Sequence, residues 1–235
     1  MESVILDRVG KTYRLDSTQV PALTDISATI RSNRFTVISG PSGSGKTTLL
    51  NLIGCIDRPD SGKIVVAGEN VQSMSDDALS DFRARHLGFI FQNFNLLPVL
   101  TAYENVEYPL LLSRVPKSRR RERVMTLLEA VGLADKAKNQ PGQLSGGQRQ
   151  RVAIARALAP EPSMVLADEP TANLDSQTGQ AIIKLMRKMQ RDFHVSFIFS
   201  SHDPHVMAEA DDTLVIRDGR IVSMKSRDEE MGVSK

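Results

Sequence analysis

The sequence predicts an α/β fold with a mixed sheet, an antiparallel β part near the N-terminus and an inserted helical subdomain. Three observations support this fold class. Short apolar runs that are typical of strands occur through the first third of the chain. Helical apolar stripes with capping signals occupy the middle, and strand and helix patterns alternate in the last third. We therefore expect one domain, with a core at about 1–93 and 162–223, a helical subdomain at about 94–161 and a polar tail at 224–235.

The first third is expected to be rich in strands. The run FTVIS at 35–39 predicts a buried strand, and the run TLLNLIGCI at 48–56 predicts the helix that follows it. One apolar face of that helix would carry Leu49, Leu52, Ile53 and Ile56. The other expected strands in this part are residues 4–6, 26–30 and 63–67, with a turn at 60–62.

The segment between this strand and this helix, GPSGSGKT, matches the phosphate-binding pattern G-x-x-x-x-G-K-[ST] at every defined position. Its glycines allow backbone N–H groups to wrap the phosphates of a nucleotide. Lys46 is expected to reach the β- and γ-phosphates, and Thr47 to offer its hydroxyl to Mg²⁺. A P-loop NTPase core that binds ATP and Mg²⁺ is therefore predicted. The expected ATP contacts here are Gly40, Pro41, Ser42, Gly43, Ser44, Gly45, Lys46, Thr47 and Thr48.

The middle of the chain is expected to be helical. Thr101 and Glu104 form a capping box at the start of one helix. An apolar stripe at 124, 127, 128 and 131 indicates another helix, which Gly132 ends. The start of that helix carries a basic cluster, which predicts either a solvated face or a contact with a partner or with anionic lipid headgroups. The cluster consists of Lys117, Arg119, Arg120, Arg121 and Arg123.

A second anion site is predicted at 144–150, LSGGQRQ, directly before a helical run at 151–158. Ser145 is a good helix cap, because its hydroxyl can accept from a free backbone N–H. Gly146 and Gly147 lack a Cβ, so the backbone there can lie close to a ligand. The helix dipole adds positive potential at this end. Since the chain already has a complete phosphate site, a second one without its own lysine suggests that one nucleotide is shared between two surfaces.

The last third is expected to alternate between strands and helices. The apolar run at 164–167 ends in Asp168 and Glu169, which predicts a buried parallel strand that presents two acids at its carboxyl edge. Asp168 would hold Mg²⁺, directly or through water, and Glu169 would orient or deprotonate the attacking water. An acidic pair after a strand is otherwise typical of a turn or a helix start. The remaining elements would be a helix with its stripe at 182, 186, 189 and 193, a strand at 195–200, a hairpin at 214–217 and 220–222, and a frayed tail from Met224.

With these three motifs on the same chain, the sequence resembles the ATP-binding subunit of an ABC transporter. LSGGQ is the signature of that family, and the resemblance covers the chain from Tyr13 to about Ile221. It implies that Ser145, Gly146, Gly147 and Gln148 contact the ATP of a partner chain, in trans.

The resemblance also implies roles for four further residues. Tyr13 resembles the aromatic residue that stacks on adenine, and Gln92 resembles the Q-loop glutamine that senses Mg²⁺ and the γ-phosphate. His202 resembles the switch histidine that contacts the γ-phosphate, and Asp175 lies in a D-loop at the dimer seam. The implied catalytic residues are Lys46, Glu169 and His202, and the implied metal ligands are Thr47, Gln92 and Asp168.

Other interpretations of these single residues remain open. A tyrosine in a short N-terminal strand commonly packs, and a histidine after an apolar strand is commonly a cap or a surface residue. The functional interpretation of His202 is favoured by its place at the carboxyl end of a predicted core strand. Gln92 follows a strand predicted at 87–91 and would lie at the same edge.

Composition excludes some classes of protein. Thirty basic residues balance 28 acidic ones, which argues against a nucleic-acid binder. The single cysteine, Cys55, cannot form an internal disulfide and suits a reducing cytoplasm. The longest apolar runs, 96–100 and 109–112, are far shorter than the roughly 20 residues that span a membrane, and the start has no signal-peptide pattern. A transporter partner would have to be a separate integral membrane subunit, with this chain bound peripherally on the cytoplasmic side of the inner membrane.

The resemblance implies an ATPase that closes as a homodimer around two ATP and drives that membrane subunit. Segments 51–62, 88–98 and 101–112 resemble the lipoprotein-release and macrolide-efflux subgroup, which implies export or extrusion. The loop at 93–100 is rich in apolar residues, so it either packs in the core or meets a partner.

Two other functions are compatible with parts of the pattern. A membrane-associated ATPase of the same family could gate a signalling or cell-division partner. A soluble ABC factor for DNA or ribosomes usually has two cassettes or long coiled-coil insertions, whereas this chain has one cassette and no heptad run.

Overall fold

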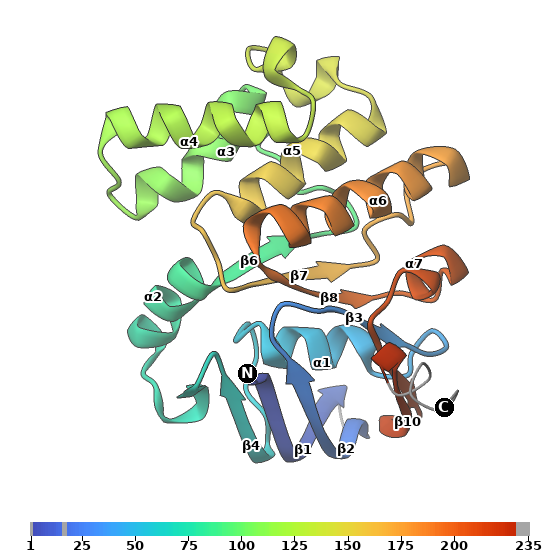
Figure 1. The fold of residues 1–235 in the computed structure, drawn as a ribbon. Coiled ribbons are helices and arrows are strands. Elements are labelled where there is room, and N and C mark those ends of the chain that lie inside the picture. Colours follow the sequence, from blue (N-terminus) through green and yellow to red (C-terminus); the bar gives the residue numbers. More distant parts are fainter. Residues whose placement is uncertain (1, 16–17, 229–235) are drawn as a thin grey trace.

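The strands of the protein lie in two sheets in the computed structural model, which describes residues 2–15 and 18–228 (Figure 1). One sheet is antiparallel and the other is parallel except for its last strand. The antiparallel sheet has the order β2-β1-β4-β5, with β1 at Glu2–Leu15, β2 at Thr18–Arg31, β4 at Ser61–Val66 and β5 at Glu69–Asn70. The mainly parallel sheet has the order β10-β9-β3-β8-β7-β6, with β3 at Phe35–Ser39, β6 at Leu87–Ile90, β7 at Met164–Asp168, β8 at Ser196–Ser200, β9 at Asp212–Arg217 and β10 at Arg220–Ser226. The predicted mixed α/β architecture is confirmed.

Helices cover both faces of the parallel sheet (Figure 1). The helix α1 (Lys46–Ile53) lies between the two sheets, whereas α6 (Ser176–Phe193) covers the opposite face. The helices α3 (Ala102–Leu112), α4 (Lys117–Ala130) and α5 (Gly146–Leu158) form a layer beyond it. Because 94–161 contains these three helices, we propose that it is the helical subdomain. The other helices are α2 (Asp76–His86), α7 (Pro204–Ala208) and the 3₁₀ turns Val71–Ser73, Ala134–Lys136 and Pro141–Gln143.

Strand β8 is apolar on both of its faces. Phe197 and Phe199 face the core under α5 and α6, where their rings contact Phe35 at centroid distances of 6.1 and 4.2 Å. Ile198, between them, faces the core around α1. A strand that is covered on both faces carries apolar residues on both, so its sequence shows no alternation.

Several predicted element boundaries were wrong, among them the start of α5, which lies at Gly146 and not at Arg151. Strands β1 and β2 form a hairpin of 14 residues each, much longer than predicted, because register shifts interrupt the apolar alternation. Helix α1 already ends at Ile53, which leaves Ile56 52% exposed. The tail is not frayed from Met224, because β10 continues to Ser226 and pairs with β9. Arg31 and Arg34 both bind Asp212 and Asp228 and so fix this end; residues 229–235 lie outside the described part.

The basic cluster at the start of α4 separates into two groups. Lys117, Arg119 and Arg121 are exposed, as a solvated face predicts. For Arg120 that interpretation was wrong, because its guanidinium pairs with Glu107 at 2.8 Å and only 16% of its side chain is exposed. Arg123 is also part-buried and belongs to a joint between helices.

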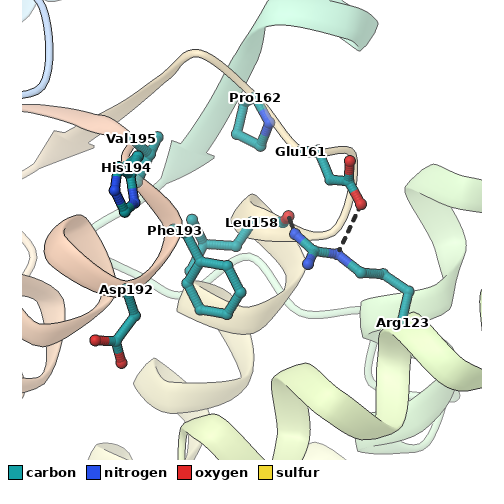
Figure 2. Close-up of a pocket in the computed structure, with 8 residues that line it drawn as sticks. All are labelled: Arg123, Leu158, Glu161, Pro162, Asp192, Phe193, His194 and Val195. Atoms are coloured by element: carbon teal, nitrogen blue, oxygen red, sulfur yellow. Dashed lines mark hydrogen bonds and ion pairs between the residues drawn. The ribbon is translucent and has the colours of Figure 1, made fainter.

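This joint surrounds a cavity of about 390 Å³ (Figure 2). Arg123 reaches from α4 and donates to the carbonyl of Leu158, at the end of α5, at 2.7 Å. Its guanidinium lies 5.2 Å from the ring centroid of Phe193, at the end of α6, and 3.7 Å from the Glu161 carboxylate. A cation is favourable beside the free carbonyls at a helix C-terminus. Arg123 therefore ties α4 to the ends of α5 and α6 at this cavity.

Acid should destabilise the protein through Asp211. Its carboxylate is part-buried, which opposes ionisation, but hydrogen bonds from Arg187 at 2.6 and 2.5 Å and from the backbone N–H of Phe35 lower its pKa. The stabilisation is thus present above the ordinary aspartate pKa of about 4 and is lost as pH falls through the lowered value. Asp211→Asn should cost about 3 kcal/mol at pH 7 and reduce the acid dependence of the melting temperature. Asp192→Asn, a half-exposed control that meets Lys188 at 3.7 Å, should change neither, and an unchanged acid dependence in Asp211→Asn would contradict this assignment.

Candidate nucleotide site

A cavity of about 370 Å³ lies where the phosphate loop meets the carboxyl ends of β7 and β8. The phosphate loop and the carboxyl edge of the sheet line one part of the cavity, and the β1–β2 hairpin lines the rest. Its lining residues are Tyr13, Val20, Pro21, Ala22, Ser42, Gly43, Gly45, Lys46, Thr47, Thr48, Glu169, Ser200 and His202. The sequence pattern did not point to Val20, Pro21 and Ala22. The pairing of Tyr13 with Val20 across the hairpin brings them to the site.

The phosphate loop turns tightly against the rest of the core. Gly45 has φ of 102°, and a Cβ there would meet the carbonyl of Ala22 at 2.6 Å. Gly40 is as restricted, because a Cβ would lie 2.0 Å from the carbonyl of Ile216. At Gly43, with φ of 76°, there is open space instead. Glycine at these positions lets the loop curl and leaves its concave side accessible.

The polar groups of this loop fit phosphates. Helix α1 begins at Lys46 with no side-chain cap and no acidic residue in its first turn, so its N-terminal N–H groups can bind an anion. The Oγ of Ser44 is buried and has no hydrogen-bond partner among the described residues. Lys46 is only 7% exposed, and its ammonium donates to the carbonyls of Gly40 and Pro41, both at 2.9 Å. These two hydrogen bonds thus hold the ammonium of Lys46 inside the phosphate loop.

Two oxygen ligands meet beside the loop. The hydroxyl of Thr47 lies 3.2 and 3.3 Å from the two carboxylate oxygens of Asp168, which ends β7. A hydroxyl and a carboxylate on adjacent elements are hard donors of the kind that Mg²⁺ takes together with nucleotide phosphates. These residues therefore fit the metal. Gln92 is exposed and lies outside the cavity lining, and its backbone carbonyl accepts from the side chain of Asn173 at 3.0 Å.

Glu169 and His202 form a pair at the mouth of the cavity. Glu169 has φ of 44°, and its N–H donates to the carbonyl of Ser200 at 2.9 Å, which locks the turn after β7 to the end of β8. Its carboxylate Oε1 lies 2.8 Å from Nδ1 of His202. The histidine side chain is 74% exposed, whereas Glu169 is 18% exposed. The backbone bond to Ser200 thus fixes the position of Glu169, and the imidazole of His202, which contacts its carboxylate, faces solvent.

The signature segment lies away from this cavity, and none of its described residues lines it. Ser145 caps α5 in a capping box: its hydroxyl accepts from the N–H of Gln148 at 3.3 Å, and its own N–H donates to Oε1 of Gln148 at 2.9 Å. The predicted cap is confirmed. A Cβ on Gly147 would meet Cγ2 of Thr178 at 2.6 Å, so close packing on α6 is a further reason for this glycine.

The D-loop lies beside the signature. Leu174 Cδ2 would be 3.3 Å from a Cβ on Gly146, and Asp175 caps α6 by accepting from the N–H of Thr178 at 2.9 Å. The structure therefore gathers most of the predicted residues into two surfaces, and Gln92 lies outside the first of them. One is the cavity with its phosphate loop, and the other holds the signature and Asp175.

Residues 23–172 match the family model described as ABC transporter. The chain belongs to the ABC transporter family. An uncharacterized ABC transporter ATP-binding protein of Thermotoga maritima is 47% identical over 219 residues, which are 93% of each chain. A macrolide export ATP-binding/permease protein MacB 1 of Yersinia pestis is 44% identical over 93% of this chain, which spans only 33% of that relative.

Solved structures agree with this assignment. A dimeric post-hydrolysis state of the ATP-binding cassette MJ0796, bound to ADP and Pi, superposes with a TM-score of 0.86 at 40% identity and covers 95% of this chain and 98% of that one. CbiO1 from Clostridium perfringens, part of an ABC transporter complex, superposes at 0.89 with 28% identity, over 99% and 92% of the two chains. The chain is an ABC ATPase cassette that binds and hydrolyses ATP. Within residues 2–15 and 18–228, no helix is long and apolar enough to cross a membrane.

Proposed function

We propose that two copies of this chain close around two ATP molecules and drive a separate integral membrane subunit in export. The observation that carries the proposal is the division of the site into two surfaces. Lys46, Thr47 and Glu169 line the cavity, and the carboxylate of Asp168 meets the Thr47 hydroxyl beside it. The capped signature helix lies outside the cavity. A C2 dimer would place the signature of each chain on the cavity of the other. The dimeric state of the MJ0796 cassette supports this arrangement.

The predicted site residues in and near the cavity each have a role in this proposal. Lys46 and the N-terminus of α1 bind the β- and γ-phosphates. Thr47 and Asp168 hold Mg²⁺, with Gln92 as its third contact, and the bound metal neutralises charge on the phosphates. Glu169 orients or deprotonates the attacking water, and His202 contacts the γ-phosphate. Tyr13 stacks on the adenine.

The partner chain completes each site. Ser145, Gly146, Gly147 and Gln148 would cover the γ-phosphate with the N-terminus of α5, and Asp175 would lie at the seam. Hydrolysis removes the phosphate that both chains bind, so the dimer reopens. The open and closed states differ in their contacts to ATP, as a ligand-driven switch requires.

A surface for the membrane subunit lies where the loop at 93–100 borders α3. The amide of Asn105, 1% exposed, organises the loop by donating to the carbonyls of Leu97, Leu100 and Thr101 and by accepting from the N–H of Leu97. Leu96 packs against the core, but Leu97 and Val99 are 40% and 76% exposed. The loop thus packs in the core through Leu96, and in this proposal Leu97 and Val99 are available to the partner.

Exposed apolar residues continue from this loop onto α3. Tyr108, Leu111 and Leu112 are 42%, 44% and 68% exposed. A cavity of about 230 Å³ is lined by Phe91 and Asn95 from the loop side and by Tyr108 and Leu112 from α3. A concave apolar surface between the core and the helical subdomain suits a short helix of a membrane subunit. The chain would then be bound peripherally on the cytoplasmic side of the inner membrane, and the MacB relatives favour export as the work done.

Leu97→Asp should weaken association with the membrane subunit while preserving folding and ATP binding. An exposed leucine contributes little to the core, whereas a buried charge at an interface costs several kcal/mol, so co-purification from detergent should fall at least about tenfold. Leu112→Asp should act in the same way. Val222→Asp, at a 55% exposed position on β10, is the matched control and should keep the complex. Intact complexes from stable Leu97→Asp and Leu112→Asp proteins would place the docking surface elsewhere.

A further inference from the structure

The phenol of Tyr13 is held by Asp57, a residue to which the sequence analysis gave no role at the nucleotide site. Tyr13 Oη donates to Oδ2 of Asp57 at 2.9 Å. The other carboxylate oxygen, Oδ1, accepts from Nζ of Lys11 and from the N–H of Arg58, both at 2.7 Å. Because both oxygens are engaged, the carboxylate has one favoured orientation, and it fixes the phenol that donates to it.

Lys11 supports the ring from a position outside the cavity lining. Its ammonium lies 5.3 Å from the ring centroid of Tyr13, and its side chain is only 11% exposed. Burial disfavours this charge, but the hydrogen bond to Asp57 and the negative charges of Asp57 and Asp60 together outweigh burial and raise the pKa of Lys11. The lysine therefore stays charged, and a part-buried cation beside an aromatic ring is favourable.

Asp57 also connects Tyr13 to the phosphate loop. The N–H groups of Ile56 and Asp57 donate to the carbonyl of Asn51, in the last part of α1, at 2.9 and 3.4 Å. The first residue of the same helix is Lys46. One helix thus carries the phosphate-binding residues at its start and the anchor of Tyr13 just beyond its end. Figure 1 shows α1 lying against the hairpin of β1 and β2, from which Tyr13 projects into the cavity lining.

We propose that Asp57 is a positioning residue that holds the Tyr13 ring in place for the nucleobase, with Lys11 supporting the same ring. The inference rests on the proposed stacking role of Tyr13. A ring that is 37% exposed would otherwise lose rotamer freedom when the base binds. A ring that is already fixed avoids that cost, so more of the stacking energy appears as affinity. Base recognition then depends on a carboxylate that does not touch the nucleotide.

The test compares a ligand with a base and a ligand without one. ADP and pyrophosphate, each with Mg²⁺, are titrated by calorimetry into the full chain. Asp57→Asn and Tyr13→Phe should each weaken ADP binding about five- to tenfold, the size of the net contribution of one typical hydrogen bond. Neither should change pyrophosphate binding. The double variant should be no weaker than either single variant, because both substitutions remove the same interaction.

Two further variants make the outcomes distinguishable. Asp60→Asn is the matched control from the same loop, since Asp60 accepts from the N–H of Thr12 and pairs with Lys11 instead, and it should leave ADP binding unchanged. Tyr13→Ala tests stacking itself. If Tyr13→Ala binds ADP normally, the stacking role is wrong. If Tyr13→Ala weakens ADP binding but Tyr13→Phe and Asp57→Asn do not, Tyr13 stacks without help and the present inference is overturned. Additive losses in the double variant, or equal loss of pyrophosphate binding, also overturn it.

Discussion

Glu169→Gln protein is expected to bind ATP with normal affinity and to hydrolyse it at least about 100-fold more slowly, the usual size of a general-base contribution. The substitution keeps the size of the side chain but removes its ability to take a proton. The backbone of residue 169 is already fixed by its hydrogen bond to Ser200, so the amide should occupy the place of the carboxylate. Binding and hydrolysis should therefore separate in this variant.

The dimer should accumulate as a consequence. If hydrolysis is what reopens the two chains, ATP should convert Glu169→Gln protein to a stable dimer in size-exclusion chromatography, whereas ADP should not. Glu161→Gln provides a matched control, because Glu161 also has positive φ but lies before the start of β7, where it pairs with Arg123. That control should hydrolyse ATP normally. Near-normal turnover in Glu169→Gln would remove this residue from the chemistry.

The features that could be predicted from the sequence were those that depend on residues close together in the chain. The phosphate loop between β3 and α1, the acids at the end of β7, the capping box at Thr101 and the helix cap at Ser145 each depend on a few consecutive positions. Local chemistry decides such features, because a cap or a glycine turn forms within one turn of the chain. Their positions in the structure match their sequence signals.

Other features depend on residues far apart in the sequence. Asp57 follows Tyr13 by 44 positions, and neither residue predicts the other. Arg31 and Arg34 hold the end of β10 through Asp212 and Asp228, although the sequence around Met224 is polar and suggested a frayed tail. Ion pairs of this kind are visible only after the sheets bring the strands together, so composition alone gave the wrong result there.

Ser145→Arg and Lys46→Ala should each abolish hydrolysis for different reasons. Ser145 is exposed at the start of α5, away from the cavity of its own chain, so an arginine there should block closure on the partner and leave nucleotide affinity of the monomer unchanged. Lys46 belongs to the cavity, and its loss should weaken ATP binding within the same chain by about 2–3 kcal/mol. Equilibrium binding of ATP to each variant separates these two effects.

Mixing the two variants tests whether the site is shared. In a mixed dimer, the intact phosphate loop of the Ser145→Arg chain faces the intact signature of the Lys46→Ala chain, and the second site carries both defects. An equal mixture should regain about a quarter of the wild-type rate, because half of the dimers are mixed and each has one good site.

Lys46→Ala mixed with Glu169→Gln is the matched control. Both of those residues act from the same surface, so every site in that mixture lacks one of them and no activity should return. The opposite outcome is that Ser145→Arg and Lys46→Ala chains form mixed dimers whose hydrolysis never exceeds that of either variant alone. The signature would then act on the ATP of its own chain. That would require α5 to move, because no residue of α5 lines the cavity in this structure.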